Sequence, residues 1–215
     1  PHVMPNVKEL GVDFYVFSTY KTFGPHQGIM WISERGLKYT EPQGHFFNDN
    51  KSRYRLNPTG PQHAQISALY GVCEYYQTLY EHHFGKTNVG IHDKTKKIFS
   101  LFQEHETILV NILLKYLREH EGIKIIGQVI AKGGRASTVA FYSKRLTSDY
   151  IAKRLASYKI GIGAGNFYAL RCIEALGVVH SAGVLRVSMV HYNTEKEVFY
   201  LIEALDEILS SIDVK

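Results

Sequence analysis

The sequence predicts a mixed α/β protein, and three observations support this fold class. From about residue 122 to the end, the apolar pattern predicts strand, strand, helix, strand, helix, strand and helix in that order. Residues 62–83 and 93–121 place their apolar side chains at helical spacing. Residues 1–35 contain two strand-like runs, which need strands from elsewhere because two strands cannot bury a core of their own.

The two N-terminal runs, DFYVFS and GIMWIS, are rich in aromatic and β-branched residues, as expected of buried strands. A polar turn joins them, and a short helical turn precedes them. Residues 36–60 are expected to be irregular, because glycine, proline and asparagine are frequent there.

Local end signals bound the C-terminal elements. Thr147 or Ser148 is the expected N-cap of the helix that follows the strand STVAFYS. KIGIGAG predicts a strand that leads into a loop, and Gly177 is expected to end the short helix after it. The strand GVLRVSMVHY comes next, and Thr194 with Glu197 predicts a capping box at the start of the last helix.

Composition is that of an ordinary soluble globular protein, with 45% hydrophobic and 21% charged residues among 215. The net charge of +5 is dispersed, and the basic run around Lys96 reads as a solvated helix face, so no nucleic-acid partner is expected. No apolar run reaches bilayer length, so no membrane partner is expected. Two cysteines far apart, Cys73 and Cys172, suggest a reducing, cytoplasmic setting. Because the chain starts at Pro1-His2, we expect it to be a piece of a longer polypeptide.

One lysine, Lys21, stands in the turn between the two N-terminal strands, next to the hydroxyls of Ser18 and Tyr20. A lysine that is held still can act as a nucleophile, and neighbouring hydroxyls can bind a phosphate. This combination suits a Schiff-base lysine that carries pyridoxal 5'-phosphate. Local chemistry alone leaves open the commoner alternative of a solvated lysine on a tight turn.

The segment DFYVFSTYKTFGPHQGIMWI resembles the lysine segment of the class V aminotransferases, a branch of the fold-type-I pyridoxal-phosphate enzymes that includes cysteine desulfurases and selenocysteine lyases. The matching residues are Asp13, Phe14, Ser18, Tyr20, Lys21, Gly24, Pro25 and Gly28. The resemblance implies that Lys21 binds the cofactor covalently and moves protons, and that the Ser18 hydroxyl binds its phosphate. Tyr20 stands where the desulfurases usually have histidine, and a phenol can still donate to phosphate.

Two later segments extend the resemblance. Thr59 lies near the position where the family's Gly-Thr-Pro reaches the cofactor phosphate of the neighbouring subunit, although the order here is Pro-Thr-Gly-Pro. Thr59 is therefore a candidate phosphate ligand, and an ordinary turn before a helix is the alternative. RVSMVHYNTEKEV resembles the family's closing strand and helix, which implies that Arg186 binds the α-carboxylate of the substrate. A guanidinium suits that role because it can make two parallel hydrogen bonds to a carboxylate.

Tyr168 aligns with the cysteine that forms the persulfide in cysteine desulfurases. Cys172 follows four positions later and is expected to be buried in a helix. Because sulfur transfer needs a thiolate, we expect transamination or a related α-carbon or β-elimination reaction on a small amino acid, with Tyr168 near the substrate. Desulfuration with a cysteine from elsewhere and a non-catalytic association module are the alternatives.

The resemblance implies the C-terminal part of a fold-type-I enzyme in three portions. These are the incomplete tail of the large cofactor-binding domain at 1–57, linking helices at 58–121 and a small α/β domain at 122–215. The family's aspartate at the pyridinium nitrogen, its ring-stacking residue and its glycine-rich phosphate turn normally lie upstream. We therefore expect a homodimer or a missing N-terminal half as partner, and an inactive isolated chain.

Overall fold

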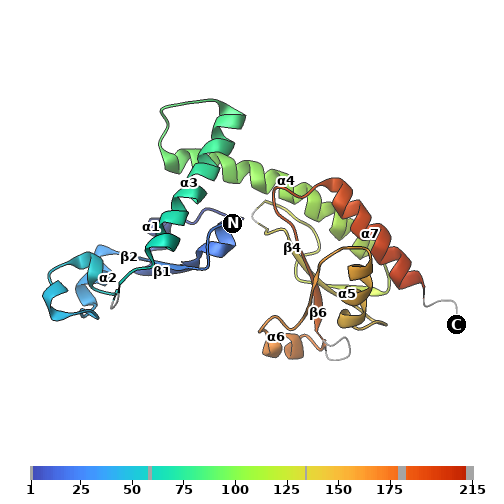
Figure 1. Ribbon diagram of the computed structural model, residues 1–215. Coiled ribbons are helices and arrows are strands. Elements are labelled where there is room, and N and C mark those ends of the chain that lie inside the picture. Colours follow the sequence, from blue (N-terminus) through green and yellow to red (C-terminus); the bar gives the residue numbers. More distant parts are fainter. Residues whose placement is uncertain (1, 58–59, 134, 179–182, 212–215) are drawn as a thin grey trace. The chain divides into compact units, whose positions relative to one another are not determined.

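The computed structural model describes residues 2–57, 60–133, 135–178 and 183–211. The chain divides into two compact units, Val3–Phe99 and Ser100–Lys215, and His2 is grouped with the second (Figure 1). The boundary falls inside the long helix α4 (Ile91–Glu119). The three-part division at 1–57, 58–121 and 122–215 stays a prediction.

The first unit contains a two-stranded antiparallel sheet of β1 (Phe14–Ser18) and β2 (Gly28–Ile32). The turn between the strands is the 3₁₀ helix η1 (Thr19–Thr22), so the predicted strand–turn–strand is confirmed. The remaining elements of this unit, besides the start of α4, are α1 (Val7–Leu10), α2 (Glu34–Tyr39), η2 (Phe46–Asn48), η3 (Ser52–Tyr54) and α3 (His63–Phe84). The segment expected to be irregular therefore begins inside a short helix, which Ser33 caps by accepting a hydrogen bond from the Gly36 N–H.

The expectation that β1 and β2 are buried is wrong for this chain. Phe14, Val16 and Met30 keep 46%, 68% and 43% of their surfaces exposed. A two-stranded ribbon has two faces, and the described residues of the first unit leave these side chains uncovered. These apolar side chains are ones that further strands and helices would bury in a larger sheet.

The second unit contains a four-stranded antiparallel sheet in the order β3-β4-β6-β5. Its elements follow the predicted order, which is confirmed: β3 (Ile123–Ile126), β4 (Thr138–Ser143), α5 (Ser148–Ser157), β5 (Gly163–Gly165), α6 (Leu170–Ala175), β6 (Val184–Ser188) and α7 (Glu195–Ser210). The predicted N-cap Thr147 accepts a hydrogen bond from the Tyr150 N–H, and the Thr194–Glu197 capping box is present.

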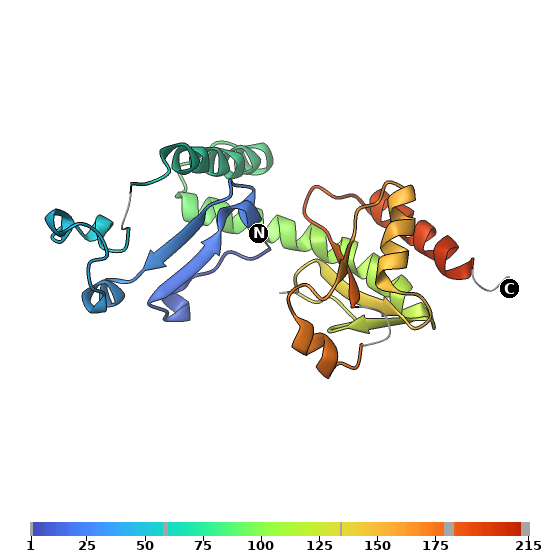
Figure 2. The same ribbon diagram turned by 60° about the horizontal axis from the view of Figure 1, so that its bottom comes forward.

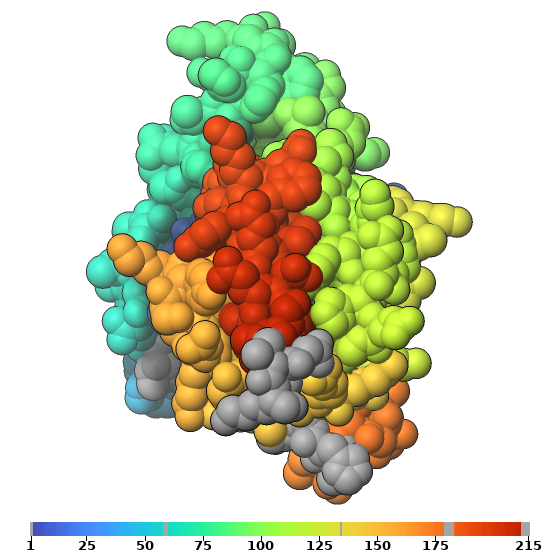
Figure 3. All heavy atoms as spheres, turned by 90° about the vertical axis from the view of Figure 1, so that its right-hand side faces the viewer, coloured from blue at the N-terminus to red at the C-terminus, as the bar shows by residue number. Residues whose placement is uncertain are grey.

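One face of this sheet carries the core of the second unit. Val139 and Phe141 in β4 lie opposite Val187 and Leu185 in β6, and all four side chains are buried. The C-terminal part of α4, with α5 and α7, packs on this face (Figure 2). Figure 3 shows α7 at the surface, flanked by α4 on one side and α5 on the other. Fully burying a leucine or phenylalanine contributes about 1.5–3 kcal/mol, so this layer fixes the sheet on which β6 lies.

Among the described segments, no helix combines the length and the apolar character that crossing a membrane requires.

Candidate functional site

The turn that carries Lys21 is held in place by Thr19, which is 1% exposed. The Thr19 hydroxyl lies 2.5 Å from the carbonyl oxygen of Pro25 and 3.0 Å from that of Gln27, so both can share its proton. The Thr19 N–H also donates to the Gln27 carbonyl, at 2.8 Å. A side chain on Gly24 would come within 3.0 Å of the Thr19 side chain, so glycine is needed at this close approach. Lys21 therefore extends from a fixed backbone.

Lys21 and Ser18 line the same cavity, which has a volume of about 480 Å³. Tyr15, Phe17 and Phe99 supply aromatic surface to its wall. The Ser18 side chain makes no hydrogen bond to the described part of the chain, although it precedes η1. The structure thus brings together one amine and one hydroxyl on a largely apolar wall.

Lys21 has no carboxylate partner within the described ranges, and its Nζ lies 5.6 Å from the centre of the Tyr20 ring. Tyr20 is 47% exposed, and its ring stacks on His26 with 4.6 Å between ring centres. Tyr20 is not among the residues that line the cavity of Lys21 and Ser18. Its role in phosphate binding stays a prediction, and Thr59 lies outside the residues that the structure describes.

Asp13 has a structural task that the sequence pattern did not reveal. Its carboxylate accepts hydrogen bonds from the Arg35 guanidinium at 2.8 Å and the Ser33 hydroxyl at 2.6 Å. The Arg35 hydrogen bond, and then that of Ser33, hold the pKa of Asp13 below its ordinary value. Asp13 is therefore an ionised acceptor that joins the start of β1 to the N-terminus of α2, and it is unsuited to act as a general acid.

Arg186 lies in the middle of β6, in the second unit, on the sheet face opposite the core. Its direct neighbours across the strands are Ala140 in β4 and Gly163 in β5. The guanidinium carbon lies 4.1 Å from the centre of the Phe167 ring. Arg186 is exposed and forms no ion pair with a carboxylate of the described residues. Its N–H donors are thus available to an external acid.

Tyr168 lies on the loop between β5 and α6 and is fully exposed. Its N–H donates to the Asn166 side chain at 3.0 Å, and its backbone is left-handed, with φ of 61°. The expected burial of Cys172 is wrong, because its thiol is exposed. The helix α6 that carries it has no buried residue, so no side of the helix shields a thiol.

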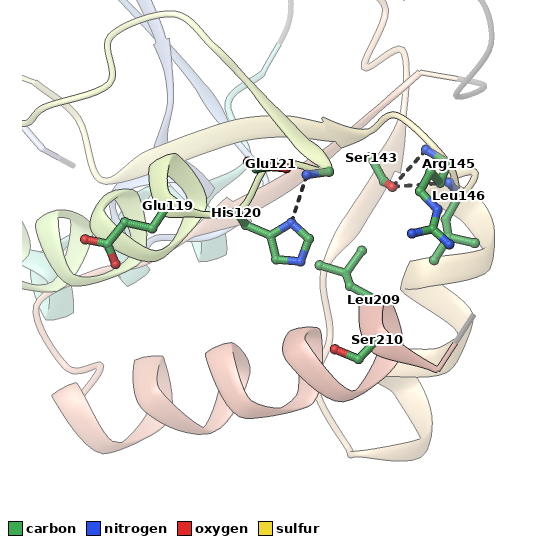
Figure 4. Close-up of a pocket in the computed structure, with 9 residues that line it drawn as sticks. Glu119, His120, Glu121, Ser143, Arg145, Leu146, Leu209 and Ser210 are labelled. Atoms are coloured by element: carbon green, nitrogen blue, oxygen red, sulfur yellow. Dashed lines mark hydrogen bonds between the residues drawn. The ribbon is translucent and has the colours of Figure 1, made fainter. Parts of the chain in front are cut away.

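Another cavity, of about 300 Å³, lies at the ends of α4 and α7 in the second unit (Figure 4). His120 lines it, and its Nδ1 accepts a hydrogen bond from the Gly122 N–H. The Ser143 hydroxyl accepts hydrogen bonds from the N–H groups of Arg145 and Leu146. These polar groups serve the turns around them. The parts of the chain with described positions also hold no group of three or more metal-ligating side chains.

The sequence matches the family model described as "Aminotransferase class-V" over residues 1–201. The chain belongs to the class V aminotransferase family. Enzymes of this family depend on pyridoxal 5'-phosphate. Ser18, Lys21 and Arg186 all fall inside the matched range.

Two fungal relatives are each 31% identical to this chain. One is the aminotransferase-like protein FGM3 of Gibberella zeae, matched over 97% of this chain and 49% of its own length. The other is the cysteine desulfurase-like protein ustD of Aspergillus flavus, matched over 98% of this chain and 45% of its own length. The chain thus spans about half the length of these relatives.

Solved structures show the same fold. The cysteine desulfurase CsdA from Escherichia coli superposes with a TM-score of 0.72 at 22% identity, covering 95% of this chain and 48% of that one. The apo cysteine desulfurase from Thermococcus onnurineus NA1 gives 0.74 at 21% identity, covering 96% and 49%. The expected fold class, the C-terminal part of a fold-type-I pyridoxal-phosphate enzyme, is confirmed.

Proposed function

We propose that this chain is the C-terminal part of a pyridoxal-phosphate-dependent class V aminotransferase-like enzyme that acts on a small amino acid. The observation that carries the proposal is the shared cavity of Lys21 and Ser18. It joins an amine on a fixed turn to a hydroxyl that makes no hydrogen bond to the described residues. The family match and the α/β fold support the same conclusion.

The residues of this cavity fit the cofactor. Lys21 extends from a turn that Thr19 fixes, and no carboxylate within the described ranges pairs with its amine, so Nζ can reach an aldehyde in the cavity. Once it has lost its proton, this amine can attack the aldehyde carbon. The Ser18 hydroxyl can donate to a phosphate oxygen, and Tyr20, two residues later and outside the lining of this cavity, is the second proposed donor. The cofactor, when bound, supplies an electron sink for charge that develops at the substrate α-carbon. Lys21 then holds or moves the proton of that carbon through its Nζ.

Arg186 is the proposed receptor for the substrate carboxylate. Its exposed guanidinium has no acidic partner in the described part of the chain, and a planar guanidinium can make two parallel bonds to one carboxylate. Its neighbour Ala140 in β4 is small, so the sheet leaves room for a ligand on that side of Arg186, while the Phe167 ring covers the Gly163 side.

The proposed chemistry is transamination or a related α-carbon or β-elimination reaction. Tyr168 stands on the exposed loop where a desulfurase would carry its reactive cysteine, and a phenol cannot accept a sulfur atom as a thiolate does. Tyr168 is instead proposed to contact the substrate.

A second candidate function, desulfuration of cysteine, is favoured by one observation, the exposed thiol of Cys172 four positions after Tyr168. Assaying sulfide release from L-cysteine by the full-length protein, and by its Cys172→Ser variant, decides this. Release that depends on Cys172 would replace transamination as the proposed reaction.

The chain needs residues that it does not contain. The exposed apolar side chains of β1 and β2 are suited to burial by the N-terminal half of the enzyme, which also supplies the partner of the pyridinium nitrogen. We therefore propose that the full-length protein is active as a cytoplasmic homodimer and that this chain alone is inactive.

The proposed function is tested in the full-length protein with Lys21→Ala and, as control, Lys38→Ala, which changes an exposed lysine in α2. The Lys21 variant should lose the visible absorbance of the lysine-bound cofactor and its turnover of amino acids, and the control should keep both. Borohydride reduction followed by peptide mapping should place the cofactor on Lys21. An unchanged spectrum in the Lys21 variant would refute the assignment, and a full-length protein that binds no cofactor would favour a non-catalytic association module.

A further inference from the structure

The guanidinium of Arg186 lies against the aromatic ring of Phe167. The guanidinium carbon lies 4.1 Å from the centre of the Phe167 ring, which is half-buried. A cation over an aromatic face is attracted by the negative charge density of the ring. The contact occupies one face of the guanidinium and leaves the N–H groups at its edge able to donate.

The backbone at Phe167 and Tyr168, beside this contact, has an energetically unfavourable left-handed conformation. Phe167 has a φ of 51° and Tyr168 a φ of 61°, which is the left-handed region that side chains with a Cβ disfavour. Two consecutive non-glycine residues in this region are maintained only where surrounding structure determines them. Here the N–H groups of Tyr168 and Ala169 donate to Asn166, and the Phe167 ring contacts Arg186.

The sheet provides the space that the Phe167 ring fills. Gly163 pairs directly with Arg186, and a Cβ on Gly163 would lie 2.8 Å and 2.9 Å from two ring carbons of Phe167. On the other side of Arg186 the neighbour is Ala140, whose side chain is also small. A glycine, an aromatic ring and a guanidinium are thus fitted to one another on the face of the sheet that the core leaves open.

Within the described ranges Arg186 forms no salt bridge, and the ring of Phe167 lies where it restricts the rotation of the guanidinium. An exposed arginine side chain loses conformational entropy when it becomes ordered on binding a ligand. A guanidinium whose plane is already held in place loses less of this entropy.

We propose that Phe167 is the positioning residue that pre-orients Arg186 for bidentate binding of the substrate carboxylate. This inference rests on the proposed function of Arg186. Phe167 touches the guanidinium and acts through it, so its removal weakens binding of the carboxylate more than it slows the chemical step.

The first test uses the 215-residue chain and needs no substrate. With arginine labelled by ¹⁵N, the ring current of Phe167 should shift the Nε–Hε resonance of Arg186, and Phe167→Tyr should retain that shift. Phe167→Leu should abolish it, and Phe199→Leu, which changes an exposed ring in α7, should not. An Arg186 resonance that Phe167→Leu leaves in place would overturn the proposal.

The second test uses the full-length protein in a double-mutant cycle of Phe167→Leu and Arg186→Gln. The ligands are the L-α-amino acid that perturbs the cofactor spectrum most strongly and the amine that lacks its carboxylate. Phe167→Leu should weaken binding of the amino acid about 3- to 30-fold, the range expected of a cation–π contact, and leave kcat and amine binding nearly unchanged. In the Arg186→Gln background, Phe167→Leu should have no further effect.

The outcomes separate the two claims. If Arg186→Gln leaves amino-acid binding unchanged, the assignment of Arg186 in the proposed function fails. If Arg186→Gln weakens binding and Phe167→Leu does not, the assignment stands and the positioning role of Phe167 fails. An equal effect of Phe167→Leu on the amino acid and the amine would also overturn that role, because it would not act through the carboxylate.

Discussion

The hydroxyl of Ser137 donates a hydrogen bond to the carboxylate of Glu106, with 2.9 Å between Oγ and Oε2. Both residues are buried, at 0% and 4% exposure. The same hydroxyl lies 2.5 Å from the carbonyl oxygen of Met189, and His2 Nδ1 lies 2.7 Å from Glu106. This buried link ties α4 to the segment before β4 and to the end of β6, the strand that carries Arg186.

Replacing Ser137 by alanine should lower the free energy of unfolding by about 1–3 kcal/mol, because a buried carboxylate loses a donor. Urea denaturation measures the change. Ser157→Ala is the matched control, since this exposed hydroxyl donates only to the Arg154 carbonyl on its own helix, and it should cost about 0.5 kcal/mol or less. Equal losses in the two variants would show that the link to Glu106 contributes little.

His191 should make stability depend on pH. Burial, as the largest cause, lowers its pKa below the ordinary value; nearby His105 lowers it further, and Glu106 opposes the shift. The unfolded chain therefore binds a proton at this residue at higher pH than the folded chain does. As the pH falls below about 6.5, the unfolded state holds more protons and the free energy of unfolding decreases.

The variant His191→Phe tests this dependence, because phenylalanine can keep the stacking on the Phe102 ring, now 3.7 Å away between ring centres. Between pH 7 and pH 5 it should lose less stability in urea denaturation than the parent chain. The exposed His92→Gln variant should behave as the parent does. A parent-like pH slope in His191→Phe would contradict the prediction.

How far the sequence predicts the fold depends on how local each determinant is. The capping box of Thr194 and Glu197 needs four consecutive residues, and it is present as predicted. The alternation of TVAFYS also suffices for β4, because only one face of that strand is buried. The burial of Cys172 was predicted wrongly, because it depends on what lies beside α6, and a helical pattern does not contain that information.

The candidate site divides in the same way. Lys21 and Ser18 are three positions apart, so a local pattern can anticipate that they line one cavity. The stacking of Phe167 on Arg186 joins residues that are far apart in sequence, and it requires the pairing of β5 with β6 and a left-handed backbone. Phenylalanine does not favour a left-handed backbone, so the sequence alone does not predict the contact between Phe167 and Arg186.

Gly183 should tolerate alanine poorly, because its φ is 101° and a Cβ would lie 2.5 Å from backbone atoms of Gly165. The overlap is with backbone, which cannot move aside without shifting β5 against β6. Gly177→Ala is the control: its φ is 68°, and a Cβ there meets nothing within 4 Å.

Gly177→Ala should cost about 1–2 kcal/mol from its left-handed backbone alone. Gly183→Ala should cost a further 1–3 kcal/mol or so, as measured by urea denaturation, because overpacking adds to the strain. Similar losses in the two variants would mean that the approach of Gly183 to Gly165 does not determine the cost.

Thr19 should matter for function through the turn that it fixes. Thr19→Val keeps the shape of the side chain and removes the hydroxyl that reaches the carbonyl groups of Pro25 and Gln27. The carbonyl oxygens of Pro25 and Gln27 then lose the shared hydroxyl proton and keep one backbone N–H donor each, so the backbone that holds Lys21 gains freedom. In the full-length protein, the variant should take up pyridoxal 5'-phosphate more weakly, about tenfold for each 1.4 kcal/mol lost.

Thr40→Val is the matched control, since its hydroxyl donates to the Leu37 carbonyl at the end of α2 and it does not line the cavity of Lys21 and Ser18. Cofactor uptake by the apo-protein is followed through the absorbance of the lysine-bound form, and the control should stay near the parent. If Thr19→Val binds the cofactor as tightly as Thr40→Val, a rigid turn is not what prepares Lys21.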